Sequence, residues 1–175
     1  MTIPASVVLI EDEAFCECTS LESVTIGEGV KSIGWRAFEN CTSLASVTIP
    51  GSVKSIEDEV FSGCTSLESV EIPGSVKSIG WYAFSGCTSL ASVTIPDCVK
   101  SIGFMAFSGC TSLASVTIPA SVESIGDYAF DRCSRLTEVE YGGTAEQWKQ
   151  IDIGSGAFSS GAKIYDKDSK EITYP

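Results

Sequence analysis

The feature that most constrains this chain is an internal repeat with a period of 23 residues. Six consecutive units run from Ile3 to Glu140, and phenylalanine, cysteine and leucine each recur once per unit. These three series are Phe15, Phe38, Phe61, Phe84, Phe107 and Phe130; Cys18, Cys41, Cys64, Cys87, Cys110 and Cys133; and Leu21, Leu44, Leu67, Leu90, Leu113 and Leu136. A unit this short cannot bury its own apolar side chains. Neighbouring units must therefore stack into one continuous core.

Each unit begins its apolar pattern with a strand. Ser46-Val47-Thr48-Ile49 alternates polar and β-branched residues with a period of two, which is typical of a strand with one buried face. The rows of Ser and Thr on alternate positions should line the exposed face. A proline follows the strand in four units and ends it: Pro50, Pro73, Pro96 and Pro119.

The other half of each unit reads as a turn. Ala37, Phe38, Cys41 and Leu44 have helix-like spacing, which predicts a single helical turn. It is followed by a residue that accepts the left-handed conformation: Asn40, Gly63, Gly86 and Gly109. The L-x-x-V-x-I spacing after each leucine is the leucine-rich-repeat pattern. We therefore expect an α/β solenoid, a right-handed leucine-rich-repeat coil with a parallel β-sheet on one face and short helical turns on the other.

These residues carry a family resemblance. The motif Ile-Pro-x-Ser-Val-x-Ser-Ile-Gly-x-x-Ala-Phe-x-Gly-Cys-Thr-Ser-Leu-x-Ser-Val-Thr resembles the 23-residue repeat of the BspA-like leucine-rich-repeat family, over residues 3–140. Residues 141–148 resemble the segment that often closes such arrays. The departures are Glu57 in place of Gly, Val60 in place of Ala and Cys98 in place of Ser. The resemblance implies a secreted or surface-attached bacterial or protist protein that binds host proteins, matrix or other cells.

The chain divides into residues 1–140, the six repeats, and residues 141–175, an incomplete seventh coil and C-terminal cap of the same domain. Residues 144–147 form a capping box before Trp148, and residues 153–158 restore the I-G-x-x-A-F element. Residues 163–165 and 171–174 predict a closing hairpin. The N-terminus enters a repeat directly, with neither signal peptide nor polar cap, which predicts a fragment or processed form of a longer array.

Composition excludes several classes of function. The 175 residues include no histidine, so triads and metal sites that need imidazole are excluded. A net charge of −12 disfavours nucleic acid and anionic membranes, and the apolar runs are too short to span a bilayer. No activated nucleophile, metal cluster or pocket is expected from the residues present. The sequence therefore predicts a non-enzymatic protein without cofactors.

The eight cysteines have a structural interpretation first. Six follow the repeat between Phe and Leu on the apolar side, where a reduced thiol acts as a small buried hydrophobe. Bridges between adjacent coils are conceivable, but each thiol has two equivalent neighbours and no pairing is specified. Cys16 and Cys18 form the only close pair, and with no histidine and no second such motif we expect no metal site.

The positions that the repeat leaves variable are the candidates for recognition. The two residues before each Ala-Phe differ from unit to unit and include types enriched in protein interfaces. The candidates for partner binding are Trp35, Arg36, Trp81, Tyr82, Phe104, Met105 and Tyr128. The residues from 81 to 128 belong to three successive coils and should form one contiguous patch. A competing interpretation is that these rings only cover the outer side of the turns.

Two functions are compatible with these features. The first is a protein-binding or adhesion module that contacts a protein, matrix or cell-surface ligand, because an extended repetitive surface is what a solenoid provides. The second is a structural spacer, or a self-associating segment of a longer array, which joins other chains end to end through its uncapped N-terminal edge.

Overall fold

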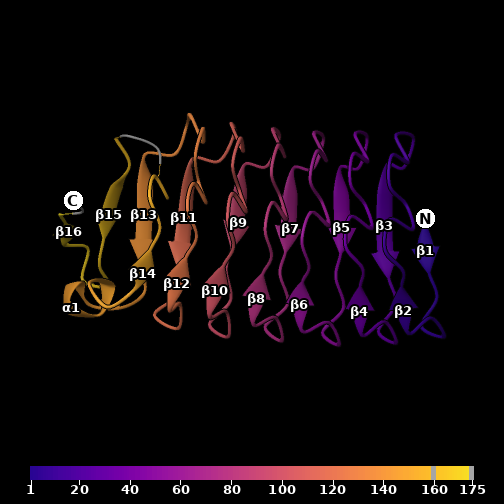
Figure 1. Ribbon diagram of the computed structural model, residues 1–175, viewed down its shortest axis with the longest axis horizontal. Coiled ribbons are helices and arrows are strands. Elements are labelled where there is room, and N and C mark those ends of the chain that lie inside the picture. Colours follow the sequence, from indigo (N-terminus) through magenta and orange to yellow (C-terminus); the bar gives the residue numbers. More distant parts are fainter. Residues whose placement is uncertain (159–160, 174–175) are drawn as a thin grey trace.

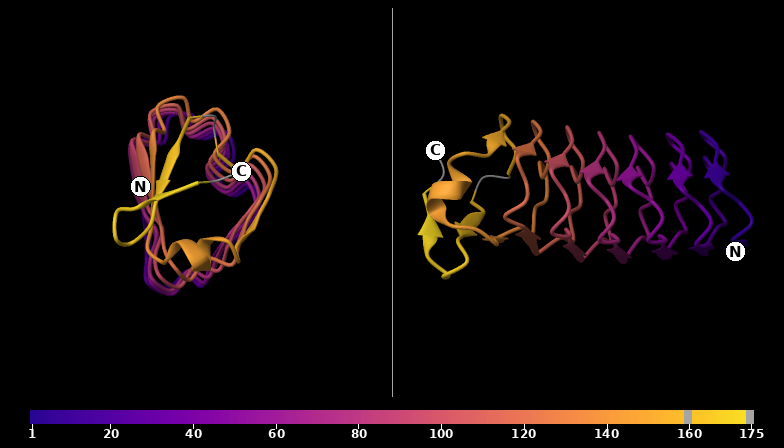
Figure 2. Two further views of the ribbon diagram at one scale, coloured as in Figure 1. Left: turned by 90° about the vertical axis from the view of Figure 1, so that its left-hand side faces the viewer. Right: turned by 90° about the horizontal axis from the view of Figure 1, so that it is seen from below.

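The repeat folds as a stack of coils. The computed structural model describes residues 1–158 and 161–173. The coils lie side by side from the N-terminus at one end of the molecule to the C-terminus at the other (Figure 1). Viewed along the stack they nearly superimpose (Figure 2). The solenoid expected from the 23-residue period is therefore confirmed.

One strand from each coil enters a nine-stranded sheet. Its strands are β1 (Thr2–Ile3), β3 (Ser23–Ile26), β5 (Ser46–Thr48), β7 (Ser69–Glu71), β9 (Ser92–Thr94), β11 (Ser115–Ile118), β13 (Glu138–Tyr141), β15 (Lys163–Tyr165) and β16 (Glu171–Ile172), in that spatial order. All neighbours are parallel except β15 and β16. Val47 pairs with Val70, its equivalent one unit later, so valines face the core and the hydroxyl residues face outward, as expected.

A second row of strands, built from the Ser-Ile dipeptide of each unit, was not predicted. It comprises β2 (Leu9–Ile10), β4 (Ser32–Ile33), β6 (Ser55–Ile56), β8 (Ser78–Ile79), β10 (Ser101–Ile102), β12 (Ser124–Ile125) and β14 (Asp152–Ile153). Five of these strands form one sheet: β6, β8, β10, β12 and β14. The other two, β2 and β4, form a separate two-stranded sheet. The row is interrupted between β4 and β6, next to Glu57.

The turns are not helical, so the prediction of a helical turn in each unit is wrong. Residues 35–40 form successive hydrogen-bonded turns, because Arg36 and Asn40 have φ angles of 54° and 55°. A left-handed residue prevents the helix from continuing and redirects the next peptide group. The Ala37 N–H therefore bonds within its coil, to the Gly34 carbonyl (3.2 Å), whereas the Phe38 N–H bonds to Val60 of the next coil (2.9 Å). These alternating bonds join the coils.

Ladders of identical side chains fill the core. Neighbouring phenylalanine rings from Phe15 to Phe158 stack with centroids 5.1–5.6 Å apart and planes within 14° of parallel. Beside them, the Cys64 thiol donates to the Phe38 carbonyl at 3.2 Å, and the cysteines of the later coils repeat this contact. All eight cysteines are free thiols. The reduced, structural interpretation agrees with this arrangement in the later coils, whereas Cys18 of the first coil is exposed and is not a buried hydrophobe as expected.

The C-terminal residues continue the stack. Thr144 caps the short helix α1 (Ala145–Trp148) in the predicted capping box, and Trp148 packs edge-on against Tyr141 with ring centroids 5.0 Å apart. Phe158 extends the phenylalanine stack. Strands β15 and β16 form the expected hairpin, of which Tyr174 lies outside the described residues.

Candidate functional site

The predicted aromatic residues meet on the turn side of the solenoid. Tyr82 contacts Phe104 edge to face with centroids 5.3 Å apart, and Phe104 contacts Tyr128 in the same way at 6.2 Å. Trp81 is 61% exposed and Tyr128 is 41% exposed. Met105, which follows Phe104 in the sequence, is half-buried. A row of rings thus crosses three successive coils.

Trp35 and Arg36 lie apart from this row, two coils closer to the N-terminus. The Arg36 guanidinium lies 4.2 Å from the centroid of the Trp35 ring. It also pairs with two carboxylates, Glu59 at 2.9 Å and Glu39 at 3.4 Å. The hydrogen bond to Glu59 raises the pKa of Arg36. The ring of Trp35 and the guanidinium of Arg36 therefore form a cation–π contact within the chain.

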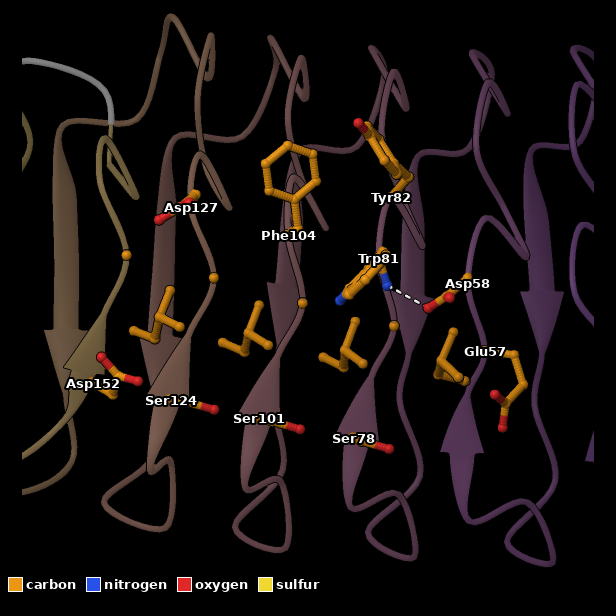
Figure 3. Close-up of a pocket in the computed structure, with 18 residues that line it drawn as sticks. Glu57, Asp58, Ser78, Trp81, Tyr82, Ser101, Phe104, Ser124, Asp127 and Asp152 are labelled. Carbon is orange, nitrogen blue, oxygen red and sulfur yellow. Dashed lines mark hydrogen bonds between the residues drawn. The ribbon is translucent and has the colours of Figure 1, made fainter.

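A groove of about 870 Å³ runs beside the aromatic row. Trp81 and Phe104 project on one side of it, and the Ser hydroxyls of β8, β10 and β12 lie on the other (Figure 3). Glu57 and Asp58 stand at one end, and Asp127 and Asp152 stand at the other. We call this feature the acidic groove. None of the described residues that line it is Lys or Arg.

Four glycines line the acidic groove. Gly80, Gly103, Gly126 and Gly154 occupy the equivalent position of four successive coils. They also allow the coils to approach, since a Cβ on Gly103 would lie 2.6 Å from the carbonyl carbon of Gly80. Each glycine N–H bonds to an isoleucine carbonyl of the preceding coil, as Gly103 does with Ile79 at 2.8 Å.

Glu57 occupies the glycine position in the third coil and ends the groove. Among the described residues, the N–H of Glu57 makes no bond equivalent to the one between Gly103 and Ile79. The second row of strands is interrupted at the same place. A smaller groove lined by Trp35 and Gly34 lies beyond Glu57, and Glu57 and Asp58 line both grooves.

The positions that vary between units are more constrained than expected. Where the first of the two variable residues is aspartate, its side chain accepts a hydrogen bond from a backbone N–H of the next coil. Asp58 Oδ1 accepts the Trp81 N–H at 2.7 Å, and Asp127 Oδ1 accepts the Ser155 N–H at 2.6 Å. The second position is left-handed in all six units, with φ between 51° and 57°: Glu13, Arg36, Glu59, Tyr82, Met105 and Tyr128. These positions vary in residue type, but each has a fixed role in the backbone of the coil. The spacing alone carried no sign of either role.

Other candidate chemistry is accounted for by structure. In the part of the chain that the structure describes, no group of three or more Cys, Asp and Glu could hold a metal ion. The Cys16 thiol lies 3.7 Å from a Glu39 oxygen, and burial together with this carboxylate raises its pKa. Within residues 1–158 and 161–173, no helix is long and apolar enough to cross a bilayer.

Comparisons with known proteins agree with the repeat. The model of the BspA type leucine rich repeat region matches six copies, over residues 1–97 and 54–166. No curated protein matches the sequence significantly.

Solved structures of bacterial leucine-rich repeat proteins are similar. The T. pallidum leucine rich repeat protein is 32% identical, with a TM-score of 0.76 over 88% of this chain and 72% of that one. A leucine-rich repeat protein from Bacteroides ovatus is 28% identical, with a TM-score of 0.59 over 91% of this chain and 59% of that one. A leucine rich cell surface protein from Faecalibacterium prausnitzii is 32% identical, with a TM-score of 0.61 over 87% of this chain and 34% of that one. With its 23-residue units, stacked coils and matching family model, this chain belongs to the BspA-type leucine-rich-repeat family.

Proposed function

We propose that this protein is a non-enzymatic protein-binding module of the adhesion kind, and that it contacts its ligand through the turn side of the solenoid. The observation that carries this is the exposed aromatic row beside the acidic groove. Trp81 is 61% exposed although its ring is large and apolar. Exposed Trp and Tyr side chains that cluster on a rigid surface are typical of binding hot spots.

The family supports a binding role. BspA-type leucine-rich repeats are typically protein-binding repeats, and one similar structure is named a cell surface protein. We extend that location to this chain as part of the proposal, with a protein, matrix or cell-surface ligand. The candidate contact residues are Trp81, Tyr82, Phe104, Met105 and Tyr128, with Trp35 and Arg36 as a separate second group.

The experiment compares two faces of the molecule. The chain is measured for saturable binding to extracellular-matrix proteins, glycans and whole cells, beside the variant Trp81→Ser/Phe104→Ser. A second variant, Thr48→Lys/Thr94→Lys, changes the exposed face of the nine-stranded sheet instead. Circular dichroism verifies that both variants fold. Binding lost only in the first variant supports the proposal; loss only in the second places the site on the sheet and contradicts it.

A second candidate function is self-association as a spacer. It is favoured by apolar side chains at the β1 end of the stack, where Val8 is 56% exposed and Leu9 is 46% exposed. Phe15 is only half-buried there, whereas Phe38 is fully buried. An apolar edge next to an edge strand is suited to pairing with another repeat array, end to end.

Sedimentation equilibrium tests this second function. A mass that rises with concentration, and returns to that of a monomer in Val8→Lys/Leu9→Lys, supports self-association. The sheet-face variant Thr48→Lys/Thr94→Lys adds the same charge elsewhere and should leave the mass unchanged. A monomeric mass at all concentrations eliminates the spacer function for this segment.

A further inference from the structure

The acidic groove combines flat rings and negative charge without a cation of its own. Four carboxylates stand at its ends, Trp81 and Phe104 form one side, and no described lining residue is basic. The whole chain carries a net charge of −12, so the potential around the groove is negative as well. A cationic ligand is therefore favoured over an anionic one.

In the second coil, a cation of the chain itself covers the indole ring of a tryptophan. Trp35, which occupies the same position as Trp81, is covered by the Arg36 guanidinium at 4.2 Å. Glu59 holds that guanidinium with two hydrogen bonds, of 2.9 Å and 3.3 Å. Trp35 is 39% exposed as a result, compared with 61% for Trp81. Among the described residues, a cation lies over the ring of Trp35 only.

The fourth coil has no arginine at the position equivalent to Arg36. Tyr82 stands where the second coil has Arg36, and its ring turns to Phe104 instead. Trp81 therefore presents a bare indole face beside carboxylates that come from neighbouring coils (Figure 3). A guanidinium supplied by a partner would meet both features at once, since it stacks on indole and pairs with carboxylates in its plane.

We propose that the acidic groove binds an extended, arginine-containing segment of a protein partner, with an arginine side chain on Trp81 and further positive charge near Glu57 and Asp152. This inference rests on the proposed function and names the chemistry of its ligand. From Glu57 to Asp152 the groove crosses five strands, β6, β8, β10, β12 and β14, and four spacings at ~4.8 Å make roughly 19 Å. Extended chain covers that length with about six residues, at ~3.3 Å each.

The test uses an acetylated and amidated peptide of alternating glycine and arginine, about seven residues long, to span this length. Its binding to the whole chain is measured by isothermal titration calorimetry. A peptide with citrulline for arginine keeps the shape and removes the charge. A neutral glucose oligosaccharide tests the other ligand class that aromatic grooves accept. We expect the arginine peptide to bind and the other two probes to bind much more weakly.

Matched variants locate the site. Glu57→Gln/Asp152→Asn removes two groove charges and leaves the capping residues Asp58 and Asp127 in place; we expect affinity to fall about tenfold. Glu22→Gln/Glu68→Gln changes net charge equally at exposed positions outside the groove and should cost less than about twofold. Trp81→Ser should weaken binding about threefold or more, and Trp35→Ser, its equivalent outside the groove, should not.

Several results would overturn the inference: equal binding of the citrulline peptide, preference for the oligosaccharide, or equal losses in the two charge variants. The outcome is separate from that of the proposed function. Matrix proteins that bind through Trp81 while the arginine peptide does not would remove only the ligand assignment. A groove that binds the peptide, in a chain whose matrix binding ignores Trp81→Ser/Phe104→Ser, would remove only the adhesion role.

Discussion

At the scale of single residues, the glycine that precedes each variable pair is set by the distance between coils. Gly103 lies against the backbone of Gly80, and the space that a Cβ would need is already occupied by the carbonyl group. Gly74, in contrast, has no atom within 4 Å of the position where its Cβ would be. Two glycines of the same fold therefore have opposite tolerance of a methyl group.

Replacing Gly103 by alanine should destabilise the protein. The new Cβ would lie 2.6 Å from the Gly80 carbonyl carbon, so the two coils must separate. Overpacking of this kind lowers the free energy of unfolding by roughly 1–3 kcal/mol. The control Gly74→Ala should be neutral or stabilising by up to about 1 kcal/mol, because it only restricts the unfolded chain. Urea unfolding measures both, and equal effects of the two changes would contradict the steric argument.

At the scale of the strand, Glu57 explains the interruption of the second row. The coils that carry glycine at this position are joined by an N–H to carbonyl bond, as between Gly80 and Ile56 at 2.8 Å. The sheet ends between β4 and β6, where glutamate replaces glycine. The side chain of Glu57 thus prevents the close approach of two coils, and the hydrogen bonds that would make one continuous row of strands do not form.

Replacing Glu57 by glycine should restore the row. We expect β4 and β6 to pair and the free energy of unfolding to rise by about 1 kcal/mol, the usual net contribution of one hydrogen bond. Glu57→Ala is the matched control, because it removes the same carboxylate and keeps the Cβ that holds the coils apart. Slower amide exchange at residue 57 in the glycine variant, compared with the alanine variant, identifies the new bond. If both variants gain equally, loss of charge is the cause.

The cysteine ladder predicts a loss of stability at high pH. Burial raises the pKa of Cys41 to about 11 and that of Cys87 to about 12, from an ordinary value of 9.0. Because these pKa values are higher in the folded state, the stabilisation is complete below about pH 9 and is lost as the pH rises towards 11 or 12. Urea unfolding with a reductant present should show this fall above about pH 9.

The control for the ladder is an exposed cysteine. Cys87→Ala removes one titrating buried thiol, so stability should fall less steeply with pH than in the parent chain. Cys98→Ala changes an exposed thiol and should leave the slope unaltered. If Cys87→Ala and the parent have the same slope between about pH 9 and pH 11, the ladder thiols do not contribute to it.

At the scale of the whole molecule, the properties that depend on period could be predicted and those that depend on contact between coils could not. The Phe ladder, the exposed hydroxyl rows and the capping box at Thr144 follow from spacing alone. The turn conformation was missed because Arg36, Tyr82 and Met105 are not residue types that signal a positive φ. The acidic groove was missed because its lining residues come from several coils, and their contact cannot be inferred from the spacing within one unit.

Removing one complete coil should preserve the fold. Deletion of residues 93–115 joins Ser92 to Val116 and leaves every remaining ladder in register, because each coil contacts only its neighbours. We expect a folded protein of lower stability whose acidic groove is one strand shorter and binds the arginine peptide more weakly. Deletion of residues 93–112, three residues fewer, shifts Phe130 and its successors out of register and should prevent cooperative unfolding. Circular dichroism and thermal unfolding compare the two, and similar behaviour would show that the 23-residue register does not determine stacking.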